Sequence, residues 1–507
     1  MKYTYILFFL LWAFFSPAQI LFPSPQAMQV NEQVFRTGKT VTVSAPDTSA
    51  FYLTLLDKEV LPPAAMQKSR SATQAQIRFI HDRTVLPEAY GLRIQPDGIE
   101  VRASGKEGFL YAVQTLRQLA VYTGGLADFP CVEITDRPRL GFRAGMLDSG
   151  RQYQQVATIK KFIDMLAMLK MNYFHWHLTD GLGWRIEIKR YPELTAKGAF
   201  VAKGAEQQGF YTQNEIREIV RYAADRCITV IPEIDMPGHA EAALSAYPEL
   251  SCFQDPVVVP ETGFTSTIFC AGKPATVAFL KQVIDEVCAL FPSPYIHLGG
   301  DEAPKDKWDK CPDCQQAVHE KNLSDSEDLQ SWFTAEMAGY LKGKGRKAVF
   351  WGDVVRHGDY PLPDNVVIQW WNWRGAGDQA LKEAQKRNLP VICNTNYYTY
   401  LNFPLHPWKG YEENRTFDLR DVYLRNPSYL PADTPCLLGM GYSLWCDYGV
   451  TEDMLDGRLF PRILALSEQM WHTGPLRDFD AFYRDVQQKK GWFEQQGYGF
   501  GPALKSE

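Results

Sequence analysis

The sequence lacks two features that would assign it to common classes of protein. It has no excess of positive charge, because 53 Lys and Arg side chains stand against 59 Asp and Glu, which gives a formal net charge of -6. Without a positive field the chain has little attraction for phosphate backbones, so we expect no nucleic-acid partner. Beyond the N-terminus no apolar run approaches the roughly 20 residues of a membrane-spanning helix, so no transmembrane segment is predicted.

The N-terminus carries the one long apolar stretch. Lys2 precedes an apolar run over residues 6–15, and the short residues Ser16, Pro17 and Ala18 follow it. A positive charge, a short apolar run and a small-residue site in this order predict a secretory signal peptide, residues 1–18. We therefore expect an exported protein, either periplasmic or secreted.

Nucleotide-binding glycine motifs are absent too, since neither G-x-G-x-x-G nor G-x-x-x-x-G-K follows any predicted strand. Ten cysteines are present. Cys252 and Cys270 bracket a loop-like stretch that a disulfide would restrain. Cys311 and Cys314 have the spacing of half a zinc site, but no second C-x-x-C or H-x-H follows at a suitable distance. This second pair is interpreted as a loop disulfide or as free thiols.

Two patterns of secondary structure divide the chain. Residues 19–137 alternate short β-rich runs with turns and contain one amphipathic helix, which predicts a small α+β domain. Residues 138–507 alternate strands with helices, which predicts a (β/α)8 TIM barrel. Its eight predicted strands are 142–147, 172–178, 228–234, 295–299, 347–351, 366–371, 390–393 and 437–445. A doubly wound open sheet is the alternative fold, but the missing glycine motifs argue against it.

Acids and indoles follow most of the predicted strands, where a barrel gathers its chemistry. Carboxylates bind hydroxyls and aromatic faces cover the apolar faces of a sugar, so this combination predicts a carbohydrate site. The block 297–302, HLGGDE, is the most informative. Adjacent strand residues point to opposite sides, so Asp301 and Glu302 can serve one site only if the backbone turns, and the preceding Gly-Gly permits that turn.

Several segments resemble the signature stretches of family 20 glycoside hydrolases, the β-N-acetylhexosaminidases. The resemblance covers about residues 85 to 475 and is carried by HWHLTD at 175–180, PEIDMPGH at 232–239, HLGGDE at 297–302, GWRIEI at 183–188, YPEL at 191–194 and GFLYAVQTL at 108–116. The last segment resembles the end of that family's accessory α+β domain. The implied substrates are oligosaccharides or glycans that carry N-acetylhexosamine, and no metal or organic cofactor is implied.

The resemblance implies substrate-assisted retaining catalysis, in which the 2-acetamido oxygen of the sugar forms an oxazolinium intermediate. Asp301 would accept the acetamide N–H, and Glu302 would protonate the leaving oxygen and then activate water. We expect the pKa of Glu302 to be raised by the neighbouring carboxylate and by an apolar site. Asp180 and His239 match the pair behind the general acid.

The residues that match the sugar-binding positions are Arg143, Trp351, Trp371, Tyr400, Asn402, Trp445 and Asp447. Arg143 would grip sugar hydroxyls with its guanidinium fork, and Tyr400 would hydrogen-bond the acetamide oxygen. Two positions depart from the family pattern, because Asn402 stands where Asp is usual and Asp447 where Glu is usual. Both match contacts to the far hydroxyls, so they bear on the preference between gluco and galacto sugars and not on the chemistry.

Three other functions fit parts of the sequence. A metal-dependent barrel hydrolase is suggested by His175-x-His177, which places both imidazoles on one side of a strand, although such enzymes need further late His ligands. A sugar-binding protein with a decayed site is the second alternative. The third is a retaining glycosidase that uses a protein nucleophile.

Overall fold

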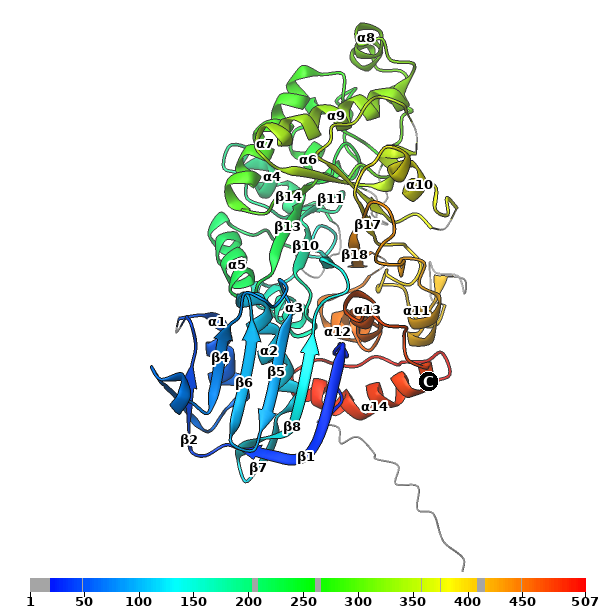
Figure 1. Cartoon of the computed structure of the whole chain (residues 1–507). Helices are drawn as coiled ribbons and strands as arrows, with labels where there is room; N and C mark the ends of the chain where they lie inside the picture. Colours follow the sequence, from blue (N-terminus) through cyan, green and yellow to red (C-terminus); the bar gives the residue numbers. More distant parts are fainter. Residues whose placement is uncertain are drawn as a thin grey trace, which may run out of the picture. The chain divides into compact units, whose positions relative to one another are not determined.

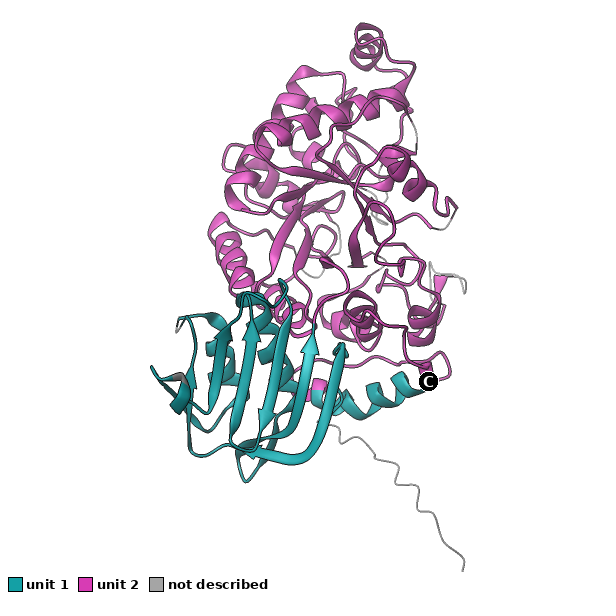
Figure 2. Cartoon of the chain, in the orientation of Figure 1, with its two compact units in different colours: residues 1–136, 480–492 teal, residues 137–479, 493–507 magenta. Residues whose placement is uncertain are grey.

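The computed structural model describes residues 19–507 except 48, 203–207, 260–265, 357, 374, 408–414 and 448, so the predicted signal peptide lies outside the described residues. The chain forms two compact units, residues 1–136 with 480–492 and residues 137–479 with 493–507 (Figure 2). Within the described residues no helix is both long and apolar enough to cross a membrane.

The first unit is built on one eight-stranded sheet in the order β1-β8-β5-β6-β4-β2-β3, with β7 paired to β8. Its strands are β1 Ala27–Arg36, β2 Thr40–Ser44, β3 Ala65–Lys68, β4 Ile77–His81, β5 Tyr90–Gln95, β6 Gly98–Ala103, β7 Val121–Thr123 and β8 Leu126–Asp136. Alternate residues of β6, such as Ile99 and Val101, are buried. They face the helix side of the sheet, where α1 (Phe51–Leu55) and α2 (Lys106–Leu119) lie (Figure 1). The predicted α+β character is present.

A segment near the C-terminus joins this unit, which the predicted boundary at residue 138 does not anticipate. Residues 480–492 belong to helix α14 (Phe479–Gln495). The ring of Phe482 packs edge-on against Phe22 at 5.8 Å, and Lys489 donates to the backbone oxygen of Gln118 at 2.8 Å. These contacts are made across several hundred residues of chain, so local sequence patterns carry no trace of them.

The second unit is the predicted barrel, and all eight predicted strands are present. They are β9 Phe142–Asp148, β10 Tyr173–His177, β13 Thr229–Glu233, β14 Tyr295–His297, β15 Lys347–Trp351, β16 Val366–Trp370, β17 Val391–Cys393 and β18 Leu437–Leu444. The strands are parallel and close in the order β10-β13-β14-β15-β16-β17-β18-β9. The seam between β18 and β9 requires Gly439, because a Cβ there would lie 2.0 Å from the backbone oxygen of Phe142.

Helices surround the barrel (Figure 1). They are α3 Val156–Met168, α4 Glu193–Ala196, α5 Gln213–Asp225, α6 Glu241–Ala246, α7 Pro274–Leu290, α8 Pro312–Glu320, α9 Ser326–Gly343, α10 Gln379–Lys386, α11 Leu419–Arg425, α12 Leu455–Leu459 and α13 Arg462–Trp471; a short hairpin, β11 Thr179–Asp180 with β12 Gly183–Trp184, follows β10. Helix α5 begins with a capping box, in which Thr212 and Glu215 satisfy each other's backbone N–H groups.

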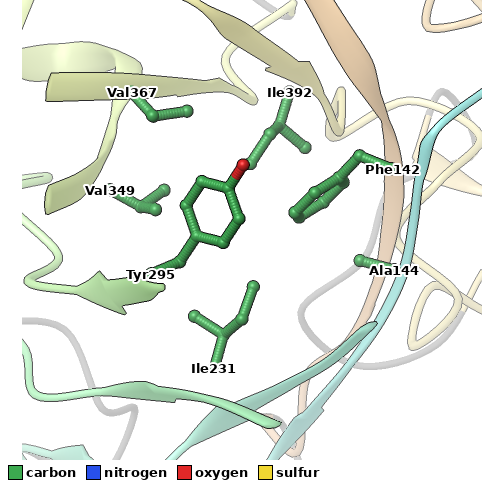
Figure 3. Packing of buried hydrophobic residues seen from close by; sticks show 7 residues of the cluster. All are labelled: Phe142, Ala144, Ile231, Tyr295, Val349, Val367 and Ile392. Carbon is green, nitrogen blue, oxygen red and sulfur yellow. The ribbon is translucent and has the colours of Figure 1, made fainter. Parts of the chain in front are cut away.

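The barrel interior is layered. Apolar side chains near the strand beginnings converge on Tyr295 and fill the lower part (Figure 3). They are Phe142, Ala144, Ile231, Val349, Val367 and Ile392. Along β9 the inward positions continue to Met146 and Asp148, because side chains of a strand alternate between its two faces. The lower layer is therefore largely apolar, and the polar side chain of Asp148 reaches the interior at the strand end.

Candidate active site

A cavity of about 330 Å³ opens at the C-terminal ends of the barrel strands. It is lined by Arg151, Asp301, Glu302, Trp371, Asn372, Asn396, Tyr397, Tyr400, Asn402, Phe403, Arg415, Trp445 and Asp447. The segments after β9, β14, β16, β17 and β18 all contribute side chains. A cavity with carboxylates, guanidinium groups and aromatic rings on its walls has the chemistry of a sugar site.

Most of the predicted site residues meet here. Those in the wall are Asp301, Glu302, Trp371, Tyr400, Asn402, Trp445 and Asp447. Asp180 and His239 are buried directly behind the two acids. Trp351 is buried and packs with Tyr400 and Trp445. Arg143 is the exception.

The predicted position of Arg143 as a sugar-binding residue is wrong. Arg143 is the second residue of β9, and its neighbours Phe142 and Ala144 face the barrel interior, so its side chain points outward. It is fully buried there and donates to the backbone oxygens of Lys170 and Leu140 at 2.8 and 2.7 Å. An arginine that does line the cavity is Arg151, which follows the end of the same strand.

Arg151 lies among several carboxylates. Its guanidinium nitrogens are 3.0 Å from Asp148 and 2.9 Å from Asp180, and the group sits 5.0 Å from the ring centre of Trp445. Burial alone would lower the pKa of Arg151, but Asp180, Asp148 and Asp447 raise it well above its ordinary value. The side chain is thus a permanent cation in the wall of the site.

The backbone turn predicted at Gly299-Gly300 is present. Gly299 and Gly300 have φ of 65° and 99°, and Glu302 has a φ of 47°. A Cβ at Gly299 would lie 1.6 Å from the Asp235 Oδ1 atom, and that same oxygen accepts the N–H of Gly300 at 3.1 Å. Glycine is therefore required for the turn that brings both Asp301 and Glu302 to one cavity.

A line of alternating carboxylates and imidazoles leads from the barrel interior to Glu302. Glu233 lies 2.5 Å from His177 Nδ1, and His177 Nε2 lies 3.3 Å from Asp180. The same Asp180 oxygen is 3.2 Å from His239 Nδ1. His239 Nε2 is then 3.5 Å from Glu302 and 3.7 Å from Asp301. Each negative charge thus has a partner that can carry a proton.

The charges in this line set the protonation of the two acids. Burial alone would lower the pKa of His239, but Asp180, Asp301 and Glu302 raise it well above its usual value. Burial alone would raise the pKa of Glu302, but the neighbouring His239 and then Arg151 lower it below its usual value. The expectation of a raised pKa for Glu302 is therefore wrong for the free protein, because the cation behind this acid outweighs burial.

Asp301 behaves in the opposite way. Burial, followed by the nearby charge of Asp235, raises the pKa of Asp301 well above its ordinary value. Burial likewise raises the pKa of Asp235 to about 7. Two adjacent acids thus have pKa values displaced in opposite directions, which is a feature of sites that divide roles between carboxyl groups.

The imidazoles of the H-x-H motif are engaged with Glu233. His175 Nε2 lies 2.8 Å from Glu233 Oε2, the same oxygen that His177 Nδ1 approaches. The indole N–H of Trp351 donates to Glu233 Oε1 at 2.8 Å. The nitrogens that a metal-dependent hydrolase would use as ligands are therefore hydrogen-bonded to a buried carboxylate, which argues against that alternative.

Aromatic rings form the opposite wall. The rings of Trp371 and Tyr400 are nearly parallel, at 7° and with centres 6.4 Å apart, and Tyr400 meets Trp445 edge-on at 5.8 Å. The Trp371 indole N–H donates to Asp353 at 2.5 Å. Tyr400 is held beside β18, because its neighbour Leu401 donates a backbone hydrogen bond to Ser443.

The two positions that depart from the family pattern interact with each other. Asn402 donates from Nδ2 to Asp447 Oδ1 at 2.8 Å, and both side chains line the cavity. Arg151, Arg415, Asn396 and Tyr397 also line it and were missed in the sequence. For Arg151 a signal existed, since it lies just beyond the end of the first barrel strand, where such residues are expected.

A closed barrel with paired acids and an aromatic wall at its C-terminal mouth defines the class of the protein as a barrel glycosidase. The model for "Glycosyl hydrolase family 20, catalytic domain" matches residues 140–474, and that for "Glycosyl hydrolase family 20, domain 2" matches residues 18–137. The chain therefore belongs to glycoside hydrolase family 20. The predicted family and enzyme class, β-N-acetylhexosaminidase, are confirmed.

Named relatives agree with this assignment. A β-hexosaminidase of Porphyromonas gingivalis is 37% identical over 80% of this chain, which spans 54% of that relative's length. A β-hexosaminidase of Akkermansia muciniphila is 33% identical over 84% of this chain and 88% of that relative's length. The crystal structure of β-N-acetylhexosaminidase from Bacteroides fragilis is 59% identical and covers 96% of this chain and 98% of its own, with a TM-score of 0.92.

The contrast between the two arginines is testable by substitution. We expect Arg151→Lys to raise KM for a chromogenic N-acetylglucosaminide roughly 10- to 100-fold, because a charged hydrogen bond is worth about 1.5–3 kcal/mol and Lys cannot reproduce the fork. Arg143→Lys should leave KM unchanged and lower the thermal unfolding temperature, since it removes donors to buried carbonyls. A raised KM in Arg143→Lys with a normal KM in Arg151→Lys would contradict this assignment.

Proposed function

We propose that this chain removes terminal non-reducing N-acetylglucosamine or N-acetylgalactosamine residues from oligosaccharides and glycans by substrate-assisted retaining catalysis. The observation that carries the proposal is that Asp301 and Glu302, neighbours in sequence, both line one cavity whose other wall is aromatic. Relatives support it, since the exo β-N-acetylglucosaminidase of Vibrio harveyi in complex with N-acetylglucosamine is 29% identical over 96% of this chain and 78% of its own, with a TM-score of 0.85.

In the first step the acetamide oxygen of the substrate attacks the anomeric carbon while the glycosidic bond breaks. Asp301 accepts the acetamide N–H and stabilises the positive charge that develops on the oxazolinium ring. Tyr400 donates its hydroxyl hydrogen to the acetamide oxygen and orients it. The pKa of Asp301 is raised in the free site, so its carboxylate form is disfavoured there. The positive charge that develops on the ring stabilises that carboxylate form in the transition state.

Glu302 supplies the proton to the leaving oxygen and recovers one from the water that opens the ring. Glu302 and His239 lie 3.5 Å apart and together hold one proton over the pH range between their displaced pKa values. When substrate excludes water, the charged form of Glu302 becomes less favourable, and the shared proton moves toward Glu302. Asp180 stabilises the cationic form of His239 and so regulates this transfer.

The remaining polar residues bind the sugar hydroxyls. Arg151 presents its guanidinium beside Asp447 and Asn402, which are joined by a hydrogen bond. Trp371 and Trp445 cover the apolar faces of the ring. Asn402 carries no charge where the family usually has a carboxylate. Its Nδ2 donates to Asp447, and an amide oxygen such as its Oδ1 is an acceptor for a sugar hydroxyl.

The two other carbohydrate functions make different predictions. A binding protein with a decayed site would not turn over substrate, yet Asp180, His239, Asp301 and Glu302 are all together in this site. A protein nucleophile would leave a covalent sugar on an Asp or Glu. Strong inhibition by a thiazoline analogue of the oxazolinium ring supports the present proposal, whereas a trapped covalent intermediate contradicts it.

We also propose that the protein is exported to the periplasm or beyond the cell. The support is the order of charge, apolar run and small residues up to Ala18. N-terminal sequencing of the protein from fractionated cells should find a chain that begins at Gln19, outside the cytoplasm. A full-length chain in the cytoplasmic fraction would contradict the proposal.

Substitution of the two acids tests the division of roles. Asp301→Ala should lower kcat on N-acetyl substrates about 100- to 1,000-fold, because it removes one preorganised transition-state contact. Glu302→Gln should lower it about 100- to 10,000-fold on natural oligosaccharides. The loss in Glu302→Gln should be smaller on a nitrophenyl glycoside, whose leaving group needs no proton.

Glu133→Gln, an exposed position of β8, is the matched control and should be unchanged. Equal losses for both leaving groups in Glu302→Gln, or near-normal rates in Asp301→Ala, would refute the assigned roles.

The line of carboxylates and imidazoles from Glu233 to Glu302 predicts how activity depends on pH. Because Asp180 raises the pKa of His239, Asp180→Asn should lower that pKa. The pair of Glu302 and His239 then loses its shared proton at a lower pH, so the alkaline limb of kcat/KM should move to lower pH. Asp97→Asn, at an exposed turn, should leave the limb in place. An unshifted limb in Asp180→Asn, despite a reduced rate, would show that His239 does not hold the proton.

A further inference from the structure

Four cysteines form a buried cluster outside the active site. Cys252, Cys270, Cys311 and Cys314 are all buried, and their sulfur atoms all lie within 4.8 Å of one another. The sequence suggested two separate local pairs, Cys252 with Cys270 and Cys311 with Cys314. The structure instead brings the two pairs together at one point.

The backbone holds this cluster in place from two sides. Ser251 and Phe269 form an antiparallel bridge, so Cys252 and Cys270, each one residue beyond it, point to the same face of the two segments. Cys311 is the N-cap residue of α8, and Cys314 lies in its first turn. The two sides touch at Gly272, where a Cβ would lie 2.3 Å from the backbone carbonyl of Asp313 and 2.4 Å from the Cys314 nitrogen. Glycine at this position therefore allows the second pair to close on the first.

The distances between the sulfur atoms match a metal site and not disulfides. Cys252 and Cys270 each lie close to Cys314, at 3.8 and 3.5 Å, and Cys270 is also 3.8 Å from Cys311. Four thiolates at about 2.3 Å from a zinc ion in a tetrahedron are separated by about 3.8 Å. A disulfide requires about 2.05 Å. Cys270 and Cys314 each approach two partners, so the cluster has no preferred pairing.

Hydrogen-bond donors lie beside the sulfur atoms. Cys311 and Cys314 lie at the N-terminus of α8, the positive end of the helix dipole. The backbone N–H of Gly272 interacts with the sulfurs of Cys270 and Cys314. Trp308, which is fully buried, donates its indole N–H to the Phe269 backbone and covers this region from water. Hydrogen bonds to the sulfur atoms are the usual outer shell of a thiolate metal site.

We propose that Cys252, Cys270, Cys311 and Cys314 bind one structural Zn²⁺ ion. Four protein ligands complete the tetrahedron and leave no open position, so the ion takes no part in hydrolysis. This differs from the expectation that the chain binds no metal. The site joins the segment that follows His239 and α6 to the segment that follows Glu302. The zinc ion would thus cross-link the loop that begins at Glu302 to the loop that begins at His239.

Metal content and thiol counts test the proposal on the whole chain. Protein purified without chelators should contain one zinc per chain by mass spectrometry of the metal. After denaturation with a chelator and without reductant, all ten cysteines should react with an alkylating reagent. Two disulfides in the cluster, which an oxidising compartment would favour, would leave only the six other cysteines reactive. That result, or reduced thiols without metal, would overturn the proposal.

Cobalt substitution and variants add independent readouts. Co²⁺ exchanged into the wild-type protein should give the strong visible and charge-transfer bands of tetrahedral thiolate coordination, a test that needs no variant to fold. Cys252→Ser and Cys314→Ser should lose zinc and unfold at a lower temperature, because bound metal stabilises only the folded state. Cys131→Ser, equally buried but in the first unit, should keep its zinc. Full zinc content in Cys314→Ser would also contradict the assignment.

Discussion

The buried negative charge of Glu233 is the constraint on which the rest of the site depends. An unpaired carboxylate in a barrel interior would cost several kcal/mol, so it must be surrounded by donors. His175, His177 and Trp351 supply them. Burial alone would raise the pKa of Glu233, but His177 and the other imidazoles lower it well below its ordinary value. The carboxylate therefore stays charged and determines how the residues above it are protonated.

The charge of Glu233 sets the protonation of the residues between it and the cavity, because anions and cations alternate along the line. Burial lowers the pKa of His175 to about 4, so this ring is neutral, whereas His177, pressed between Glu233 and Asp180, has its pKa raised well above the ordinary value despite burial. His177 then supports Asp180 as an anion, and Asp180 supports the cationic form of His239. The general acid thus contacts a proton donor whose charge state is fixed by groups that solvent does not reach. Below this layer the interior is filled by apolar side chains that pack around Tyr295.

The parts of this arrangement that depend on local pattern were predictable, and those that depend on distant contacts were not. The eight strands follow from short apolar runs, and the turn at Gly299 follows from the steric freedom of glycine. The error at Arg143 came from a motif match that ignored alternation along β9, which points this side chain outward. The lowered pKa of Glu302 depends on His239, far away in sequence, and the four-cysteine cluster depends on an approach at Gly272. Neither the contact between Glu302 and His239 nor the close approach at Gly272 can be read from the spacing of residues along the chain.

Arg151 connects recognition of the sugar to the chemistry. Its guanidinium contacts Asp180, in the middle of the line of carboxylates and imidazoles, and it also lines the cavity beside Asp447. A hydroxyl that hydrogen-bonds to Arg151 or Asp447 therefore alters the field at Asp180, and through it the stability of the cation on His239. We therefore expect a sugar that fills the proposed hydroxyl subsite to shift the proton that Glu302 and His239 share, and a truncated ligand to leave it in place. In the proposed mechanism, binding energy from the sugar hydroxyls is thus used at the bond that breaks, so it raises kcat as well as affinity.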